Sequence, residues 1–216
     1  MAPASRQPPA MDPQGASGAA TGGAVQRYFD VRFGVTVVKV LPGGHYVTGR
    51  ADEMLATILG SCVSACIRDA ELGLGGMNHF MLPASADGAW GMVLAQMRYG
   101  NFAMEALIND IIARGGRRER LEIKVFGGAN LGGGPASVGD RNAAFVEQFL
   151  RSQGLHIAAS HLRGDCPRRI HYRPSNGVVK MLELRVEADL ALLSGDARHQ
   201  AGAGGAQADV GEEWFT

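Results

Sequence analysis

The sequence predicts an α/β protein, a sandwich built on a mixed sheet with two main amphipathic helices. Strand-like segments occur in two arrangements along the 216 residues. Some follow each other across a short turn, as antiparallel hairpins do, and others are separated by a helical segment, as parallel strands are. Because both arrangements occur, a mixed α/β sandwich fits the chain better than a purely parallel sheet.

Composition divides the chain into three parts. Residues 1–26 are rich in Pro, Ala, Gly, Ser and Gln and contain almost no large apolar side chains, which predicts a disordered segment. Residues 193–216 have a similar composition, and we expect a flexible tail there. Residues 27–192 carry periodic apolar patterns and are numerous enough for one globular domain with its own core.

Runs of β-branched and aromatic residues predict the strands. The run at 28–40 reads as one strand that ends at Pro42-Gly43-Gly44. The runs at 63–69 and 75–82 are separated by a glycine-rich turn and predict a hairpin. A second hairpin is expected within 168–186, with its turn at 174–177. The remaining strands are expected at 54–59, 121–128 and 155–162.

Two segments show the apolar spacing of a helix with one buried face. The first is 99–116, which should end at Gly115-Gly116 because glycine accepts the positive φ of a helix terminus. The second is 138–154, which should end at Gly154. The inward side chains are expected to be Met104, Leu107, Ile108, Ile111 and Ile112 in the first helix, and Phe145, Val146, Phe149 and Leu150 in the second.

Charge and cysteine content exclude several classes of protein. The chain has 21 basic and 21 acidic residues, so no field of one sign would attract nucleic acid or an anionic membrane. No window reaches the roughly 18 consecutive apolar residues of a membrane span, and we expect no membrane insertion. Three cysteines without a signal-peptide pattern predict a cytoplasmic protein with free thiols.

Cys62 is the first candidate for chemistry. It follows Gly60 and Ser61 on a predicted turn, where small residues would let a carbonyl substrate approach and free N–H groups could bind an oxyanion. A cysteine attacks only as the thiolate, so it needs a neighbouring group that takes its proton. The alternative is a buried, inert cysteine, which is the commoner environment of a free thiol.

His79 could be that neighbouring group. If 63–69 and 75–82 pair as a hairpin, His79 comes close to this turn in space. A symmetric register, however, would place His79 opposite Cys66 rather than Cys62. Turn placement favours Cys62 and register favours Cys66, so the residues alone leave two candidate thiols, and His79 could also be a structural histidine.

No cofactor or metal is expected. The glycine-rich stretch at 126–134 follows a strand but lacks the Gly-Lys-Ser/Thr ending of a phosphate-binding loop. Cys62 and Cys66, four residues apart in an extended segment, would be about 13 Å apart and could not share one zinc ion with Cys166 and His79. The "GEEWF" stretch near the C-terminus is either a short docking motif or a tail without a partner.

Several separate stretches, in order from about residue 30 to 183, resemble the CheD family of chemoreceptor glutamine deamidases. The stretches are "TILGSCVSACIRD", "GGMNHFMLP", "RYGNFAMEALINDIIARGG", "KVFGGANL", "VGDRNAAFVEQFL" and "GDCPRRIHYRPSNGVVKML". The Gly-Ser-Cys and His-Phe-Met-Leu-Pro elements are the family's catalytic signature. The resemblance implies a CheD-like α/β sandwich over residues 27–192.

The resemblance also implies an activity and its residues. The family hydrolyses the side-chain amide of receptor glutamines to glutamate and releases ammonia, with methyl-accepting chemoreceptors as substrate proteins. Carried over, Cys62 is the nucleophile, His79 the general base and Thr57 the third member that orients the imidazole. Gly60 and Ser61 would shape the substrate and oxyanion site. A CheC-type phosphatase is an expected partner in some bacteria.

Two other functions remain open from the sequence. The chain could be a non-catalytic adaptor that binds receptors or a phosphatase, although the presence of both Cys62 and His79 argues against this. It could also be a different thiol hydrolase on the same scaffold, such as a receptor methylesterase. Release of ammonia rather than methanol distinguishes the deamidase from the methylesterase.

Overall fold

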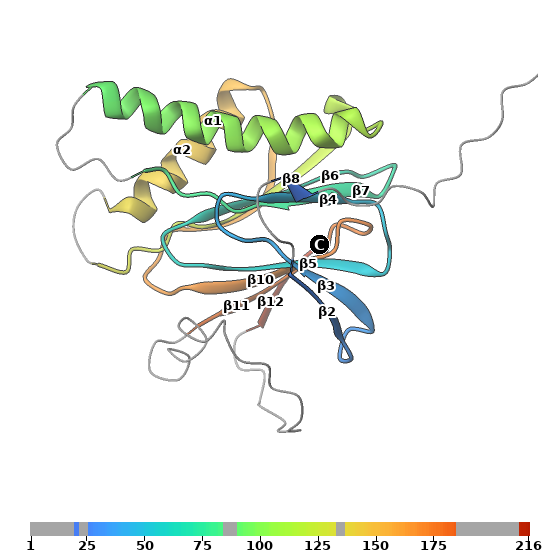
Figure 1. Cartoon of the computed structure of the whole chain (residues 1–216). Helices are drawn as coiled ribbons and strands as arrows, with labels where there is room; N and C mark the ends of the chain where they lie inside the picture. Colours follow the sequence, from blue (N-terminus) through green and yellow to red (C-terminus); the bar gives the residue numbers. More distant parts are fainter. Residues whose placement is uncertain (1–19, 22–25, 84–89, 133–136, 185–211) are drawn as a thin grey trace, which may run out of the picture.

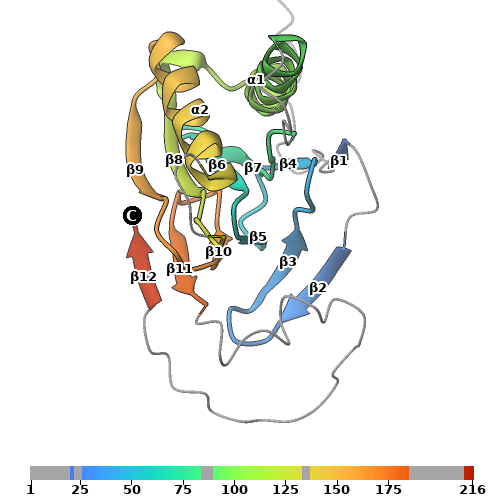
Figure 2. The same ribbon diagram turned by 90° about the vertical axis from the view of Figure 1, so that its left-hand side faces the viewer.

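Two six-stranded sheets lie face to face in the computed structural model, and two helices cover the outer face of one of them (Figure 1 and Figure 2). The structure describes residues 20–21, 26–83, 90–132, 137–184 and 212–216. The architecture is the mixed α/β sandwich that the sequence predicts. Within the described residues, no helix is both long enough and apolar enough to cross a membrane.

The helix-covered sheet mixes antiparallel and parallel neighbours. The expected hairpin is present, because β6 and β7 pair antiparallel, and β8 pairs parallel to β9 with helix α2 between them in sequence. The strands, in spatial order, are β1 (Ala20–Thr21), β4 (His45–Thr48), β7 (Leu74–Asn78), β6 (Val63–Asp69), β8 (Leu121–Gly127) and β9 (Ile157–Leu162).

The second sheet is built around β5, which is parallel to β3 and antiparallel to β10. The expected hairpin of β10 and β11 is present, and Gly177 in its turn has a φ of 77°. The strands, in spatial order, are β12 (Glu212–Phe215), β11 (Val179–Glu183), β10 (Arg168–Tyr172), β5 (Glu53–Leu59), β3 (Val35–Lys39) and β2 (Gln26–Asp30).

The prediction of one strand over residues 28–40 is wrong. This segment holds two antiparallel strands, β2 and β3, joined by a turn at residues 31–34. The carboxylate of Asp30 accepts hydrogen bonds from the backbone and the side chain of Arg32, and Gly34 has a φ of 63°. An aspartate that bonds its own backbone two residues on, followed by a left-handed glycine, is turn chemistry.

The two terminal segments each contribute a short strand to a sheet. Residues 212–215 form strand β12 at the edge of the second sheet, within the segment 193–216 for which the sequence predicts a flexible tail. Residues 193–211 lie outside the described residues, as do 1–19 and 22–25 of the N-terminal segment. The two-residue strand β1 falls within the segment that we expected to be disordered.

Both predicted helices are present. α1 (Trp90–Ala113) begins earlier than expected and ends as predicted, where the N–H groups of Gly115 and Gly116 bond to the carbonyls of Ile112 and Ile111. α2 (Val138–Ser152) is capped by Ser137, whose hydroxyl accepts the N–H of Asp140. A short 3₁₀ turn, Arg118–Arg120, precedes β8.

The inward faces of the helices are those that the apolar spacing predicts, with two differences. Ile112 of α1 is 38% exposed and Phe145 of α2 is only partly buried. The other predicted side chains are buried, namely Met104, Leu107, Ile108, Ile111, Val146, Phe149 and Leu150.

Alternating residues of β6 face two separate cores. Val63, Ala65 and Ile67 belong to the core beneath the helices, whereas Cys66 belongs to the core between the sheets. Cys62, just before the strand, packs against this second core. Side chains in a strand alternate between faces, so the end of β6 that bears Cys62 presents it toward the other sheet.

Gly76 allows β7 to pack closely under α1, and its replacement tests this packing. A Cβ atom at position 76 would lie 2.3 Å from the carbonyl oxygen of Tyr46 and 2.9 Å from Leu107. We expect Gly76→Ala to lower the free energy of unfolding by about 1–3 kcal/mol, measured by urea denaturation. Gly132→Ala, where nothing lies within 4 Å, should change it by less than about 0.5 kcal/mol. Equal stability of the two variants would contradict the close contact.

Candidate active site

The turn at Gly60-Ser61-Cys62 connects the two sheets, because β5 belongs to one and β6 to the other. The glycine-rich loop after β8 holds this turn through its backbone. The N–H of Gly128 donates to the carbonyl of Cys62 at 2.7 Å, and the N–H of Ala129 donates to the carbonyl of Gly60 at 2.9 Å. Both carbonyls are therefore fixed, and Cys62 remains partly exposed.

The same contacts show what the glycine-rich loop does. Gly127 has a φ of 112°, and a Cβ there would lie 2.2 Å from the carbonyl oxygen of Cys62. Only glycine permits this approach. Two of the loop's N–H groups are bonded to the Cys62 turn, which leaves them unavailable to a phosphate, and the loop serves as a support for the thiol-bearing turn.

The support continues into the loop that precedes β10. The N–H of Arg163 donates to the carbonyl of Gly127, and the N–H of Asn130 donates to the carbonyl of Gly164. The buried guanidinium of Arg168 donates to the carbonyls of Gly127, His161 and Arg163. Arg168 pairs with Leu59 at the end of β5 and so ties these loops to the strand that leads into the turn.

Asn142 is a site residue that the sequence analysis missed. It is fully buried, its amide nitrogen donates to the carbonyl of Ser61 at 2.7 Å, and its amide oxygen accepts the N–H of Leu82 at 2.8 Å. One side chain of α2 thus joins the Cys62 turn to the segment after His79. A signal was present, because Asn142 lies on the apolar face of its helix, four residues before Val146.

His79 directly follows β7, and two hydrogen bonds fix its backbone. Its N–H donates to the carbonyl of Gly44 at 3.0 Å, and its carbonyl accepts the N–H of Gly43 at 2.7 Å. The next residue, Phe80, exchanges both backbone hydrogen bonds with Val63. The side chain of His79 is buried, with 4% exposure.

The strand register determines which residue lies opposite His79. Cys66 pairs with Met77, and Val63 pairs with Phe80, so His79 lies opposite Ser64. The symmetric register that placed His79 opposite Cys66 is therefore wrong. Cys62 and Cys66 are then both diagonal neighbours of His79, two residues to either side of Ser64, and such positions are typically about 7–8 Å apart across a strand pair. Burial distinguishes the two thiols, because Cys62 is partly exposed and Cys66 is buried.

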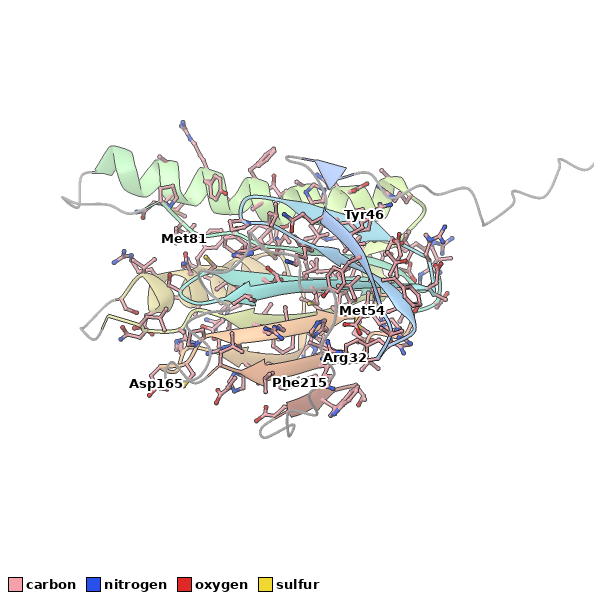
Figure 3. All side chains as sticks on the ribbon, turned by 60° about the horizontal axis from the view of Figure 1, so that its bottom comes forward. Arg32, Tyr46, Met54, Met81, Asp165 and Phe215 are labelled. Atoms are coloured by element: carbon pink, nitrogen blue, oxygen red, sulfur yellow. The ribbon has the colours of Figure 1, made fainter. Side chains whose placement is uncertain are left out.

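Cys66 is the core residue that its mid-strand position suggests. It is fully buried between the sheets, and burial raises the pKa of its thiol far above the ordinary value. Cys166 lies before β10, where its thiol donates to the carboxylate of Asp165. In Figure 3, Asp165, the neighbour of Cys166, lies at the same end of the sandwich as Met81, which is two residues after His79. Among the described residues, no group of three or more metal-ligating side chains occurs.

Thr57 and His79 form a hydrogen bond that joins the two sheets. The Thr57 Oγ1 and His79 Nδ1 atoms are 2.8 Å apart, and Thr57 Oγ1 donates its only proton to the carbonyl of Val40, also at 2.8 Å. The hydroxyl must therefore accept a hydrogen bond from His79, which assigns the proton of the neutral imidazole to Nδ1. Nε2 is then the atom with a free electron pair, and it has no hydrogen-bond partner among the described residues.

Burial sets the protonation of both groups. It lowers the pKa of His79 to about 4, against the opposing effect of the Val40 carbonyl. It also raises the pKa of the Cys62 thiol. At neutral pH the site therefore holds a neutral thiol and a neutral imidazole, and a low-dielectric environment disfavours a resting thiolate–imidazolium pair.

These features define a class of protein: an α/β sandwich with a partly exposed thiol on a turn that backbone hydrogen bonds hold, and with a buried histidine–threonine pair. A family model described as CheD chemotactic sensory transduction matches residues 81–183. A protein of Rhodopseudomonas palustris named probable chemoreceptor glutamine deamidase CheD is 60% identical over 161 residues, which are 74% of this chain and 76% of that protein.

Other similar proteins carry the same name. One from Hahella chejuensis is 48% identical over 75% of this chain and 77% of its own length, and one from Cupriavidus pinatubonensis is 45% identical over 89% and 91%. The chain belongs to the CheD family.

The tautomer of His79 can be tested by ¹⁵N NMR of the imidazole nitrogens at pH 7. We expect Nδ1 to carry the proton and Nε2 to have none, because the Thr57 hydroxyl can only accept from the ring. Thr57→Val removes that acceptor and should change the tautomer populations, whereas Thr36→Val, in a neighbouring strand, should not. A protonated Nε2 in the unaltered protein would contradict the assignment.

Proposed function

We propose that this chain deamidates glutamine side chains of chemoreceptors, with Cys62 as the nucleophile and His79 as the general base. The observation that carries the proposal is the Thr57–His79 hydrogen bond, which leaves the buried Nε2 atom as a proton acceptor on the face of the strand pair that bears Cys62. The names of the related proteins support glutamine amides of chemoreceptors as the substrate.

In the first half of the reaction, Cys62 Sγ attacks the amide carbon of the substrate while His79 Nε2 accepts the thiol proton. The amide oxygen becomes an oxyanion, for which the N–H of Cys62 is the proposed donor. The imidazolium formed in this step is stabilised at Nδ1 by Thr57. It then gives its Nε2 proton to the leaving nitrogen, and ammonia departs from a thioester.

In the second half, His79 Nε2 takes a proton from water as the water attacks the thioester. As the tetrahedral intermediate collapses, the His79 imidazolium returns its Nε2 proton to Cys62 Sγ, which regenerates the thiol, and glutamate is released. The rigid turn contributes orientation, because the carbonyls of Gly60, Ser61 and Cys62 all accept hydrogen bonds from neighbouring segments. Gly60 and Ser61 thereby shape the approach to the thiol.

The surroundings of the turn suit a protein substrate. Met81 and Leu131 are 46% and 54% exposed. The Ser61 hydroxyl donates to the Met81 sulfur at 3.8 Å, and the side chain of Leu131 lies over Gly60. Two exposed apolar side chains beside the thiol suit the apolar stripe of an amphipathic helix that presents one glutamine.

The two other functions that the sequence leaves open, methylesterase and adaptor, would give different results in the tests below. A receptor methylesterase would need the same thiol but would release methanol, and an adaptor would need neither Cys62 nor His79. Binding to a CheC-type phosphatase stays a prediction from the family resemblance.

Mass spectrometry of a receptor cytoplasmic domain after incubation with the protein tests the reaction and the nucleophile together. We expect the mass gain of amide-to-acid conversion at particular glutamines, with release of ammonia. Cys62→Ser should lower kcat/KM by at least about 1,000-fold. Cys66→Ser, a matched change in the core, should retain activity in the folded protein.

The alternatives give different results. Loss of activity with Cys66→Ser but not with Cys62→Ser would reject the proposed nucleophile. Release of methanol without ammonia would favour the methylesterase, and full chemotaxis with Cys62→Ala would favour the adaptor.

The pH dependence of kcat/KM tests whether the Cys62 thiol and the His79 imidazole are both neutral before attack. Activity is lost as pH falls through the pKa of His79, because protonation of Nε2 removes the base. With a pKa of about 4, kcat/KM at pH 5.5 should stay within about twofold of its value at pH 7.5. A histidine at its ordinary pKa would cause a loss of about tenfold over this interval.

Two results of this measurement would contradict the mechanism. A tenfold loss at pH 5.5 would mean that His79 is not desolvated in the working enzyme. A rate that rises about tenfold per pH unit up to the thiol pKa would mean that the thiolate forms before, and not during, attack.

A further inference from the structure

The C-terminal strand is bound to the edge of the second sheet in the manner of a separate peptide. β12 pairs antiparallel with β11, with Leu182 opposite Glu212 and Val179 opposite Phe215 (Figure 2). Residues 184–211 separate the two strands in the sequence, whereas a hairpin partner normally follows within a few residues. β12 is therefore not joined to β11 by a short hairpin loop.

Phe215 makes the contacts on the inner face of this strand. Its ring packs edge-on against Phe126 with centroids 5.1 Å apart, and His161 lies 6.5 Å away (Figure 3 labels Phe215). The buried ammonium of Lys124 donates to the carbonyls of Phe215 and Gly177. An aromatic side chain and a backbone carbonyl are thus recognised together.

Trp214 makes the contacts on the outer face. The ammonium of Lys180, its partner in the ladder, lies 5.0 Å from the Trp214 ring and 5.2 Å from the ring of Phe33. A cation between two aromatic rings is attracted to both. Lys180 also places positive charge next to Met181, the ladder partner of Glu213. The charge of Lys124 is paired with Glu122 at 3.1 Å.

We propose that the edge of β11, with Lys124, Phe126 and Lys180, is a binding site for an extended peptide with two acidic residues followed by Trp and Phe. The chain's own residues 212–215 occupy the site as a tethered, exchangeable ligand. Backbone pairing supplies affinity and alternate side chains supply specificity, as in other cases of strand addition. A protein that presents such a segment could add its strand here once β12 leaves.

Competition between tethered and free peptide tests the proposal on the full chain. A tethered ligand has an effective concentration of about 1 mM, so the unaltered chain should bind a free peptide poorly. Phe215→Ala weakens the tethered strand. We expect the Phe215→Ala chain to bind fluorescein-labelled Gly-Glu-Glu-Trp-Phe-Thr at least about tenfold more tightly than the unaltered chain, measured by fluorescence anisotropy.

A peptide with Ala in place of Phe is the matched control and should bind at least about tenfold more weakly than the unaltered peptide. Equal binding of the unaltered peptide by both chains, or no binding by a folded Phe215→Ala chain, would overturn the proposal. A chain that ends at Gly211 provides a second variant. If neither variant folds, β12 is part of the fold rather than a ligand.

Light scattering identifies the source of the bound strand. A monomer at the concentrations of the binding experiment supports a strand bound within its own chain. A dimer that dissociates when residues 212–216 are removed would mean that two copies exchange their strands, which would overturn binding within one chain.

Discussion

The hydrogen bond between Thr57 and His79 is the interaction on which the site depends, because it joins one sheet to the other at the position of the imidazole. The Thr57 proton is committed to the carbonyl of Val40, so the ring can only donate to the hydroxyl. This commitment determines which imidazole nitrogen is free. A packing contact between two sheets thereby also assigns the chemistry of the histidine.

The turn that bears Cys62 is held by segments distant in sequence. The glycine-rich loop after β8 supplies N–H groups to the turn, and Asn142 of α2 holds both the turn and the backbone of Leu82. Arg168 donates hydrogen bonds to carbonyl groups in the two loops that support the turn. A reactive group held by elements that are themselves packed and bonded keeps its geometry through the reaction. The same burial that provides this support keeps the thiol and the imidazole neutral.

The two sheets differ in the elements that cover or complete them. One sheet is covered by both helices, whereas the edge of the second sheet at β11 is completed by four residues from the C-terminal end of the chain (Figure 1). An exposed edge offers unpaired N–H and C=O groups to any extended segment. Phe215 contacts Phe126 and Lys124, and Trp214 contacts Lys180, so any other segment added at this edge would have to replace these contacts.

The sequence by itself determined the α/β class, both helix faces, the two hairpins and the glycine ends of the helices, because these follow from local periodicity and backbone conformation. Family motifs singled out Cys62, His79 and Thr57. Only the tertiary structure decided the burial that separates Cys62 from Cys66, the division of 28–40 into two strands, the contacts of Asn142 and the docking of residues 212–215. Each of these depends on a partner far away in the chain, and a hydrogen bond or strand pair between distant segments leaves no periodic signal in either segment alone.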